Sequence, residues 1–444
     1  MIRMSRHTVH LAGLPLLALV LGCPPKDSDP ATVTMTNPST DPSSGPTSAT
    51  NTTDPTDTET GTSTDTNDTG IASDNVDILF IVDNSGSMAP SQERLTDAID
   101  NLIDPLLDAG LDLRIGITTT DVGNPRCPEG STRPAKGNLI LSSCVDRIDD
   151  GDFTFFGTDP PIDASEICTN ACIYANDDLE VVPTATALEP DPKPRPWIEL
   201  HDGSSNVSTG TALELLGCYL PQGIYGCGFE SPLEAMYIAL IRANTPGEDS
   251  YGFIREDATL AIIIITDETD CSAQDDTIFT SNKVFWNDPN DPTPTSAVCW
   301  RAGVDCMGDP NDYDCDAANF GAGGNSGASD DSAVLYPLSR YSQLLEDLLA
   351  AKTQGDVQLH VIAGVPPGYS GGIEPIYSGV GNGNPQFLEN FGIDPACTDA
   401  DIFAVPSIRE RELAESIADG APPVYSICSP DYSLDSIAQA ILDQ

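Results

Sequence analysis

Residues 76–87 read VDILFIVDNSGS. The first seven are apolar apart from Asp77, which is typical of a buried β-strand, and the last five have the form D-x-S-x-S. A strand that stops at Asp83 and turns at the following glycine would bring the side chains of Asp83, Ser85 and Ser87 together at its carboxyl end, where ligands bind in open parallel sheets. One carboxylate and two hydroxyls are hard oxygen donors of the kind that Mg²⁺ or Mn²⁺ accepts.

The rest of the chain alternates strand and helix patterns. Residues 258–266 form an unbroken, largely β-branched run that predicts a strand buried on both faces, and it is followed at once by Asp267. Residues 111–118 and 357–363 alternate as strands do, and the first of these is expected nearer the edge of the sheet. Helical spacing of apolar residues marks the segments 95–107, 233–240, 338–351 and 434–442. This order predicts a doubly wound α/β fold, with a mostly parallel sheet flanked by helices on both faces.

The D-x-S-x-S loop after a buried strand, with an amphipathic helix behind it, resembles the von Willebrand factor A (VWA) family and its metal-ion-dependent adhesion site. The resemblance implies that Asp83, Ser85 and Ser87 hold Mg²⁺ or Mn²⁺ and that Asp267 supports the cation through water. A carboxylate of a partner would complete the metal shell. The resemblance covers residues 75–444, interrupted by two insertions at about 121–225 and 268–336.

The sequence departs from the family at the middle ligand, which is usually a threonine in a loop before a helix. In the loop before the helical segment at 233–240, Glu230 lies near that position. Glu230 either replaces the threonine, which gives a more anionic site, or Thr119 or Thr120 serves instead. A third interpretation is that Glu230 and Pro232 only begin the helix, where acidic residues and proline are favoured.

The N-terminal residues predict an exported and anchored chain. Residues 1–22 combine arginines with a short apolar run at 11–21, as in a signal peptide, and they end before Cys23 in a sequence that resembles a bacterial lipobox. Lipidation at Cys23, followed by Pro24 rather than aspartate, resembles an outer-membrane address. Residues 23–74 are rich in Thr, Ser, Asp and Pro, so after the lipidated cysteine they are expected to form a disordered tether.

Thirteen cysteines minus Cys23 leave twelve, an even number that predicts disulfides in an exported chain. Most of them fall in the two insertions, where crosslinks would order loops with few apolar residues. A zinc cluster is poorly supported, because Cys168 and Cys172 form an isolated C-x₃-C pair.

Composition limits the function classes. With 19 Lys and Arg against 69 Asp and Glu, the net charge of -50 disfavours nucleic acid and anionic membrane surfaces as partners. No nucleophile elbow, Walker loop or zincin motif occurs, and beyond residue 22 only His201 and His360 remain, so no enzymatic activity is expected. Residues 312–316, DYDCD, have acids at alternate positions, as calcium-binding loops do, and so suggest an additional Ca²⁺ site. An EF-hand is excluded, because Ala317 and Gly323 occupy the positions where that motif needs Gly and Glu.

Together these features predict a lipoprotein of the outer membrane or cell surface that adheres, through its metal, to an acidic group on a protein or surface glycan. The alternative is a structural scaffold of an envelope assembly, in which the metal site is degenerate or purely structural.

Overall fold

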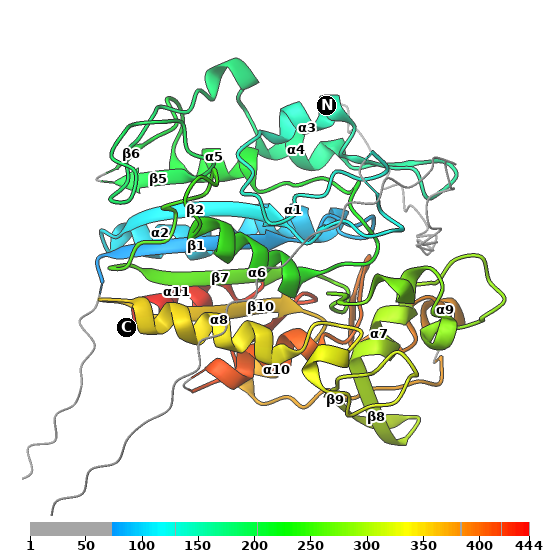
Figure 1. The fold of residues 1–444 in the computed structure, drawn as a ribbon. Coiled ribbons are helices and arrows are strands. Elements are labelled where there is room, and N and C mark those ends of the chain that lie inside the picture. The colour runs from blue at the N-terminus through cyan, green and yellow to red at the C-terminus, as the bar shows by residue number, and fades with distance from the viewer. Residues whose placement is uncertain (1–72, 129, 202, 382–383, 419, 444) are drawn as a thin grey trace, which may run out of the picture. The chain divides into compact units, whose positions relative to one another are not determined.

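The computed structural model describes residues 73–444, except residues 129, 202, 382–383, 419 and 444. Its centre is a seven-stranded sheet in the order β13-β10-β7-β1-β2-β5-β6 (Figure 1). The five strands from β13 to β2 run parallel, whereas β5 and β6 are antiparallel to their neighbours. The strands are β1 (Asn75–Val82), β2 (Asp112–Thr119), β5 (Ile198–His201), β6 (Ser204–Ser205), β7 (Thr259–Ile265), β10 (Val357–Ala363) and β13 (Val424–Ser426).

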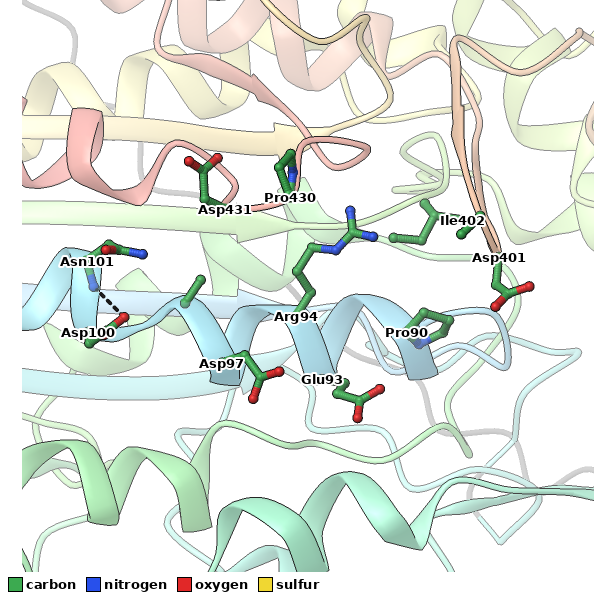
Figure 2. Close-up of a pocket in the computed structure, with 12 residues that line it drawn as sticks. Pro90, Glu93, Arg94, Asp97, Asp100, Asn101, Asp401, Ile402, Pro430 and Asp431 are labelled. Atoms are coloured by element: carbon green, nitrogen blue, oxygen red, sulfur yellow. Dashed lines mark hydrogen bonds between the residues drawn. The ribbon is translucent and has the colours of Figure 1, made fainter. Parts of the chain in front are cut away.

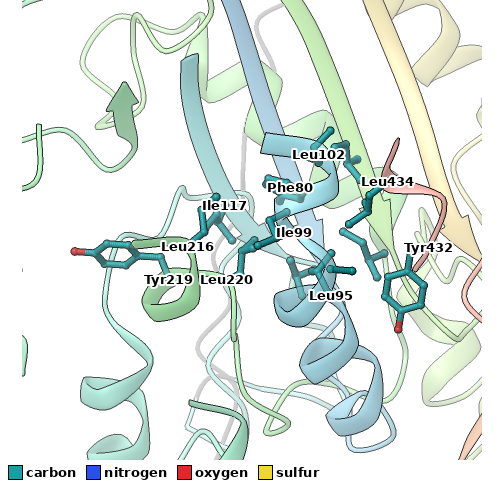
Figure 3. Packing of buried hydrophobic residues seen from close by; sticks show 14 of the residues in the cluster. Phe80, Leu95, Ile99, Leu102, Ile117, Leu216, Tyr219, Leu220, Tyr432 and Leu434 are labelled. Atoms are coloured by element: carbon teal, nitrogen blue, oxygen red, sulfur yellow. The ribbon is translucent and has the colours of Figure 1, made fainter. Parts of the chain in front are cut away.

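Helices cover both faces of the sheet, which confirms the predicted doubly wound fold. Side chains of β1 alternate between the faces: Phe80 packs with one apolar cluster and Ile81 with the other. The first cluster includes α1 (Ala89–Ala98), α2 (Asp100–Asp108), α5 (Ala212–Tyr219) and α11 (Leu434–Leu442), and Figure 3 shows Phe80 among their apolar side chains. The second includes α6 (Pro232–Ala243), α8 (Leu338–Ala351) and α10 (Ile408–Ile417).

Two details of the fold differ from the sequence-based expectation. The strand predicted nearer the edge, β2, lies inside the sheet, because β5 from the first insertion pairs with it and β6 pairs with β5. The helical pattern at 95–107 belongs to two helices, since α1 ends and α2 begins around Ile99. Neither difference moves the carboxyl end of β1, where the predicted site lies.

The insertions contain short elements tied together by disulfides. The first holds α3 (Cys144–Asp150), β3 (Thr154–Phe155), β4 (Ile162–Asp163), α4 (Ser165–Ala171) and η1 (Asn176–Asp178). The second holds η2 (Asp276–Phe279), η3 (Lys283–Phe285), α7 (Ala297–Gly303), β8 (Val304–Asp309), β9 (Asp312–Ala317) and η4 (Asp330–Ser332), and it has an apolar core that includes Phe285 and Trp286. Beyond β10 come η5 (Tyr369–Gly371), α9 (Pro385–Phe391), β11 (Cys397–Asp399) and β12 (Ile402–Ala404).

All twelve cysteines of the described domain are paired in six disulfides, which confirms the predicted crosslinking. The pairs are Cys127–Cys227, Cys144–Cys168, Cys172–Cys218, Cys271–Cys299, Cys306–Cys315 and Cys397–Cys428. Cys168 and Cys172, the pair considered for zinc, are bonded to different partners.

Thiol counting checks these disulfides. Mature protein denatured without reductant is expected to show almost no alkylation at these twelve positions, because a disulfide sulfur is not a free thiol. After reduction, all twelve should react. Alkylation of most of them before reduction would contradict the six pairs.

The predicted signal peptide, Cys23 and the tether up to residue 72 lie outside the described residues. Within the part of the chain that is described, no helix is long and apolar enough to cross a membrane.

Candidate metal centre

Three neighbouring parallel strands end at the same edge of the sheet. The register pairs Val82 of β1 with Thr119 of β2 and with Ile265 of β7. The segments that follow these strands therefore start side by side, although they are far apart in the sequence. Asp83, Thr120 and Asp267 come from these three segments, as expected for a site at the carboxyl ends of parallel strands.

The D-x-S-x-S loop folds tightly around the side chain of Asp83, which is fully buried. The Ser85 backbone N–H donates a hydrogen bond to Asp83 Oδ1 at 2.8 Å, and the Thr266 hydroxyl donates one to Asp83 Oδ2 at 2.6 Å. The hydroxyls of Ser85 and Ser87 lie 3.2 Å apart, and Ser87 Oγ donates to Asp267 Oδ1 at 3.1 Å. The structure thus brings together the three predicted residues of the loop, Asp83, Ser85 and Ser87, and Asp267 from the segment after β7.

Glu230 lies at the same place and is also fully buried. The Thr120 hydroxyl donates a hydrogen bond to Glu230 Oε2, so two of the residues considered for the middle ligand are partners of each other. Glu230 Oε1 and the buried hydroxyl of Thr119 have no hydrogen-bond partner among the described residues. A buried carboxylate oxygen without a donor is costly, so Glu230 Oε1 could accept a further hydrogen bond or contact a cation.

The structure also shows what caps helix α6. Pro232 is at its first turn, as expected, but the first free backbone N–H groups are capped by the loop after β7: Leu233 N donates to Asp270 Oδ1 and Glu234 N to Ser272 Oγ. The carboxylate of Glu230 is directed instead to Thr120. Starting the helix is therefore not the role of the Glu230 side chain.

Four acidic side chains, here called the carboxylate cluster, interact electrostatically at this edge: Asp83, Glu230, Asp267 and Glu268. Burial raises the pKa of Asp83 to about 6, against the hydrogen bond from Thr266, which lowers it. The pKa values of the other three are raised well above their usual range, by burial first and then by the negative charge of Asp83. The charge of Asp83 thus makes ionisation of the other three harder.

No lysine or arginine pairs with the carboxylate cluster among the residues that the structure describes. Two other buried acids do have such partners: Asp77 pairs with Arg255 at 2.8 Å, and Asp270 with Arg409 at 3.0 Å. Because isolated buried charges are strongly disfavoured, a cluster without a basic partner needs protons or a cation.

The donor set of the site consists of carboxylate and hydroxyl oxygens. Across the described residues, no group of three or more His, Cys, Asp or Glu side chains is arranged to hold a metal ion by itself. A cation here would therefore have to use the hydroxyls of Ser85 and Ser87 together with Asp83. These oxygens suit a hard divalent cation and not zinc in a thiolate or imidazole site.

Three residues of this site were not identified from the sequence. Glu268 directly follows Asp267 in the acidic sequence DETD at residues 267–270, and this pattern could have marked it as a site residue. Thr266 ends the β-branched run, so the sequence pattern predicts only one more strand residue at this position. Nothing in the sequence around Gln92 marks it as a site residue. Gln92 lies in α1, and its side-chain amide donates hydrogen bonds to the backbone oxygens of Asp83, at 2.9 Å, and Gly223, at 2.7 Å.

Other polar residues noted in the sequence lie elsewhere. Nδ1 of His201 lies 2.6 Å from a carboxylate oxygen of Asp112, and His360 is buried in β10, where burial lowers its pKa to about 4. The acids of residues 312–316 lie in β9, which pairs with β8 in a hairpin, and not in a loop. The additional Ca²⁺ site stays a prediction.

A groove of about 580 Å³ runs beside α1 and α2 (Figure 2). Its lining includes the acidic residues Glu93, Asp97, Asp100, Asp401 and Asp431. Arg94 reaches across it from α1 and pairs with Asp399 at 2.7 Å. None of the predicted metal ligands lines this groove, so it is separate from the candidate metal centre.

Comparisons with known proteins leave the family open. No protein-family model matches the chain, and no curated protein matches it. Among solved structures, the chain is similar to the pilus adhesin SpaC from Lactobacillus rhamnosus GG, with 10% sequence identity and a TM-score of 0.31. The match covers 83% of this chain and 30% of the adhesin. A similarity this distant carries no functional argument.

Proposed function

We propose that this chain is an anchored recognition protein of the VWA type, which binds a partner through a divalent cation, Mg²⁺ or Mn²⁺. The observation that carries the proposal is the carboxylate cluster, which is buried without a basic partner among the described residues and includes the acceptor of the Ser87 hydroxyl, Asp267. One of its oxygens, Glu230 Oε1, is buried and has no hydrogen-bond partner in the part of the chain that the structure describes. A divalent cation would neutralise the charge and supply the missing partner.

Each residue has a distinct role in this proposal. Asp83, Ser85 and Ser87 hold the cation directly, and Asp267 supports it through water while accepting the hydrogen bond of Ser87. Glu230 takes the place of the family's threonine, and Thr120 fixes its second oxygen. The added negative charge favours tight cation binding and a less acidic ligand than an all-hydroxyl middle position would accept.

The proposed action is adhesion and not catalysis. A carboxylate on a protein or surface glycan partner would occupy the remaining position of the metal shell. Cells that make the protein should attach to their partner surface in Mg²⁺, lose attachment in EDTA and regain it when Mg²⁺ is restored. Attachment or assembly that ignores chelation would instead favour a structural scaffold.

Anchoring is a separate prediction. Cys23→Ser is expected to release the protein from the membrane fraction or to stall its export, since the acylated sulfur would be lost. Membrane fractionation and metabolic labelling with a fatty acid measure both effects. Unchanged membrane association together with unchanged acyl labelling would rule out lipidation at Cys23.

A further inference from the structure

Aromatic side chains of the first insertion lie against the D-x-S-x-S loop. The ring of Phe155 covers Gly86 so closely that a Cβ atom on this glycine would come within 2.7 Å of the ring. The next residue, Phe156, is 65% exposed, and its ring meets that of half-buried Tyr225 edge to face, with centroids 6.1 Å apart. A large exposed phenylalanine of this kind is enriched at protein interfaces.

The segment that carries Tyr225 is fastened to the same loop. The Gly226 N–H donates to the backbone oxygen of Asn84 at 2.7 Å. The side-chain oxygen of Gln92 accepts from the N–H groups of Gln222 and Gly223, while its amide group donates to the Asp83 carbonyl. Because the buried amide of Gln92 is bonded on both sides, it fixes this segment relative to Asp83.

A second set of bonds holds the segment from the insertion side. The guanidinium of Arg147 donates to the backbone and side-chain oxygens of Gln222, and the Ile224 N–H donates to the Asp152 carbonyl at 2.7 Å. The segment that carries Tyr225 therefore forms a preformed wall beside the metal loop, and the ring of Phe156 meets Tyr225 edge to face. A preformed contact surface loses little conformational entropy on binding.

We propose that Phe156 and Tyr225 form a contact platform for a polypeptide partner, which places an apolar side chain on these rings next to its metal-binding carboxylate. The inference rests on the proposed function of the metal centre and adds the class of its partner. A net charge of -50 repels a polyanionic glycan, whereas a polypeptide can offer one carboxylate beside an apolar residue.

The test uses the Mn²⁺-loaded protein and two blocked dipeptides, acetyl-Asp-Phe-amide and acetyl-Asp-Ala-amide, with glucuronate as a sugar acid. Calorimetry measures the dissociation constants of Mn²⁺ and of each probe. The phenylalanine dipeptide should bind about tenfold tighter than the alanine dipeptide, since an aromatic contact contributes on that order. Phe156→Ala and Tyr225→Ala should each reduce this ratio towards one and leave Mn²⁺ affinity unchanged.

Met307→Ala is the matched control, because Met307 is also 65% exposed but lies in β8 of the second insertion. It should leave the ratio intact. A ratio that survives both aromatic substitutions would overturn the platform while the metal centre stands. If glucuronate binds more tightly than either dipeptide, and Phe156→Ala and Tyr225→Ala weaken its binding, the proposal of a polypeptide partner is wrong. Failure of the wild type to bind Mn²⁺ would overturn the proposed function and the platform with it.

Discussion

Binding of Mg²⁺ and Mn²⁺ is expected to disappear when Asp83 is replaced by alanine, while the sheet stays folded. Asp83 supplies the only formal charge of the D-x-S-x-S loop, and its two oxygens also organise Ser85 and Thr266. Because second-sphere changes alone weaken metal sites by roughly 10–100-fold, loss of this ligand should weaken binding by more than about 100-fold.

The fold should survive because β1 is held by apolar side chains on both faces of the sheet and by parallel pairing with β2 and β7. Removing Asp83 also removes the charge that raises the pKa of the other members of the carboxylate cluster. The lost hydrogen bonds are thus offset in part by weaker repulsion.

Calorimetry measures cation binding and circular dichroism measures the fold, both on wild type and Asp83→Ala. Asp97→Ala is the matched control, since it removes an exposed acid from α1 close by in the sequence. Its cation affinity should equal that of the wild type. If the wild type takes up no divalent ion at millimolar concentration, or Asp83→Ala binds it equally well, the adhesion-site mechanism is wrong and a scaffold role becomes the better account.

Much of this site could be predicted because it follows from strand ends. A buried run that stops at Asp83 and another that stops at Thr266 must end at one edge if the strands are parallel neighbours. Their polar continuations then meet. The end of one strand therefore placed Asp83, Ser85 and Ser87 together, and the resemblance to the VWA family added Asp267 to them.

The role of Glu230 could not be settled from the sequence, for a physical reason. Before a proline that starts a helix, an acidic residue satisfies local helix preferences and is equally suited to ligate a cation. Which role applies depends on Thr120, which is 110 residues earlier, and on the loop after β7, whose Asp270 and Ser272 cap the helix. The role of the Glu230 side chain is therefore determined by tertiary contacts, which the local sequence does not show.

The same argument covers the other elements that were not predicted. The short strand β5 extends the sheet only because β2 offers it an unpaired edge, and its own four residues carry too little pattern to reveal this. In the sequence, Gln92 is one polar residue of a predicted helix. In the structure, its side-chain amide donates hydrogen bonds to the backbone oxygens of Asp83 and Gly223 and so connects the metal loop to the wall that carries Tyr225. Disulfide pairing likewise depends on how the loops meet.

In the presence of EDTA, the protein is expected to lose stability as pH rises from about 4 to above 6. The carboxylate cluster has raised pKa values in the folded state, with Asp83 at about 6 and the other members raised well above their usual range. In this window the unfolded chain releases protons that the folded chain keeps, so rising pH favours unfolding. The shift at Asp83 alone, from 3.8 to about 6, corresponds to about 3 kcal/mol.

Melting temperatures at about pH 5 and pH 8, with EDTA or with excess Mg²⁺, measure this effect in the wild type and in Glu230→Gln. The glutamine keeps an acceptor for Thr120 but removes one buried charge, so the variant should lose less stability at the higher pH in EDTA. Mg²⁺ should restore much of the loss in the wild type, since a cation at about 100 times its dissociation constant stabilises by about 2.7 kcal/mol. Parallel pH profiles for the two proteins, with no effect of Mg²⁺ at either pH, would show that the carboxylate cluster does not hold a cation. The difference between the proteins is the decisive quantity, because it cancels the titration of the many acids that they share.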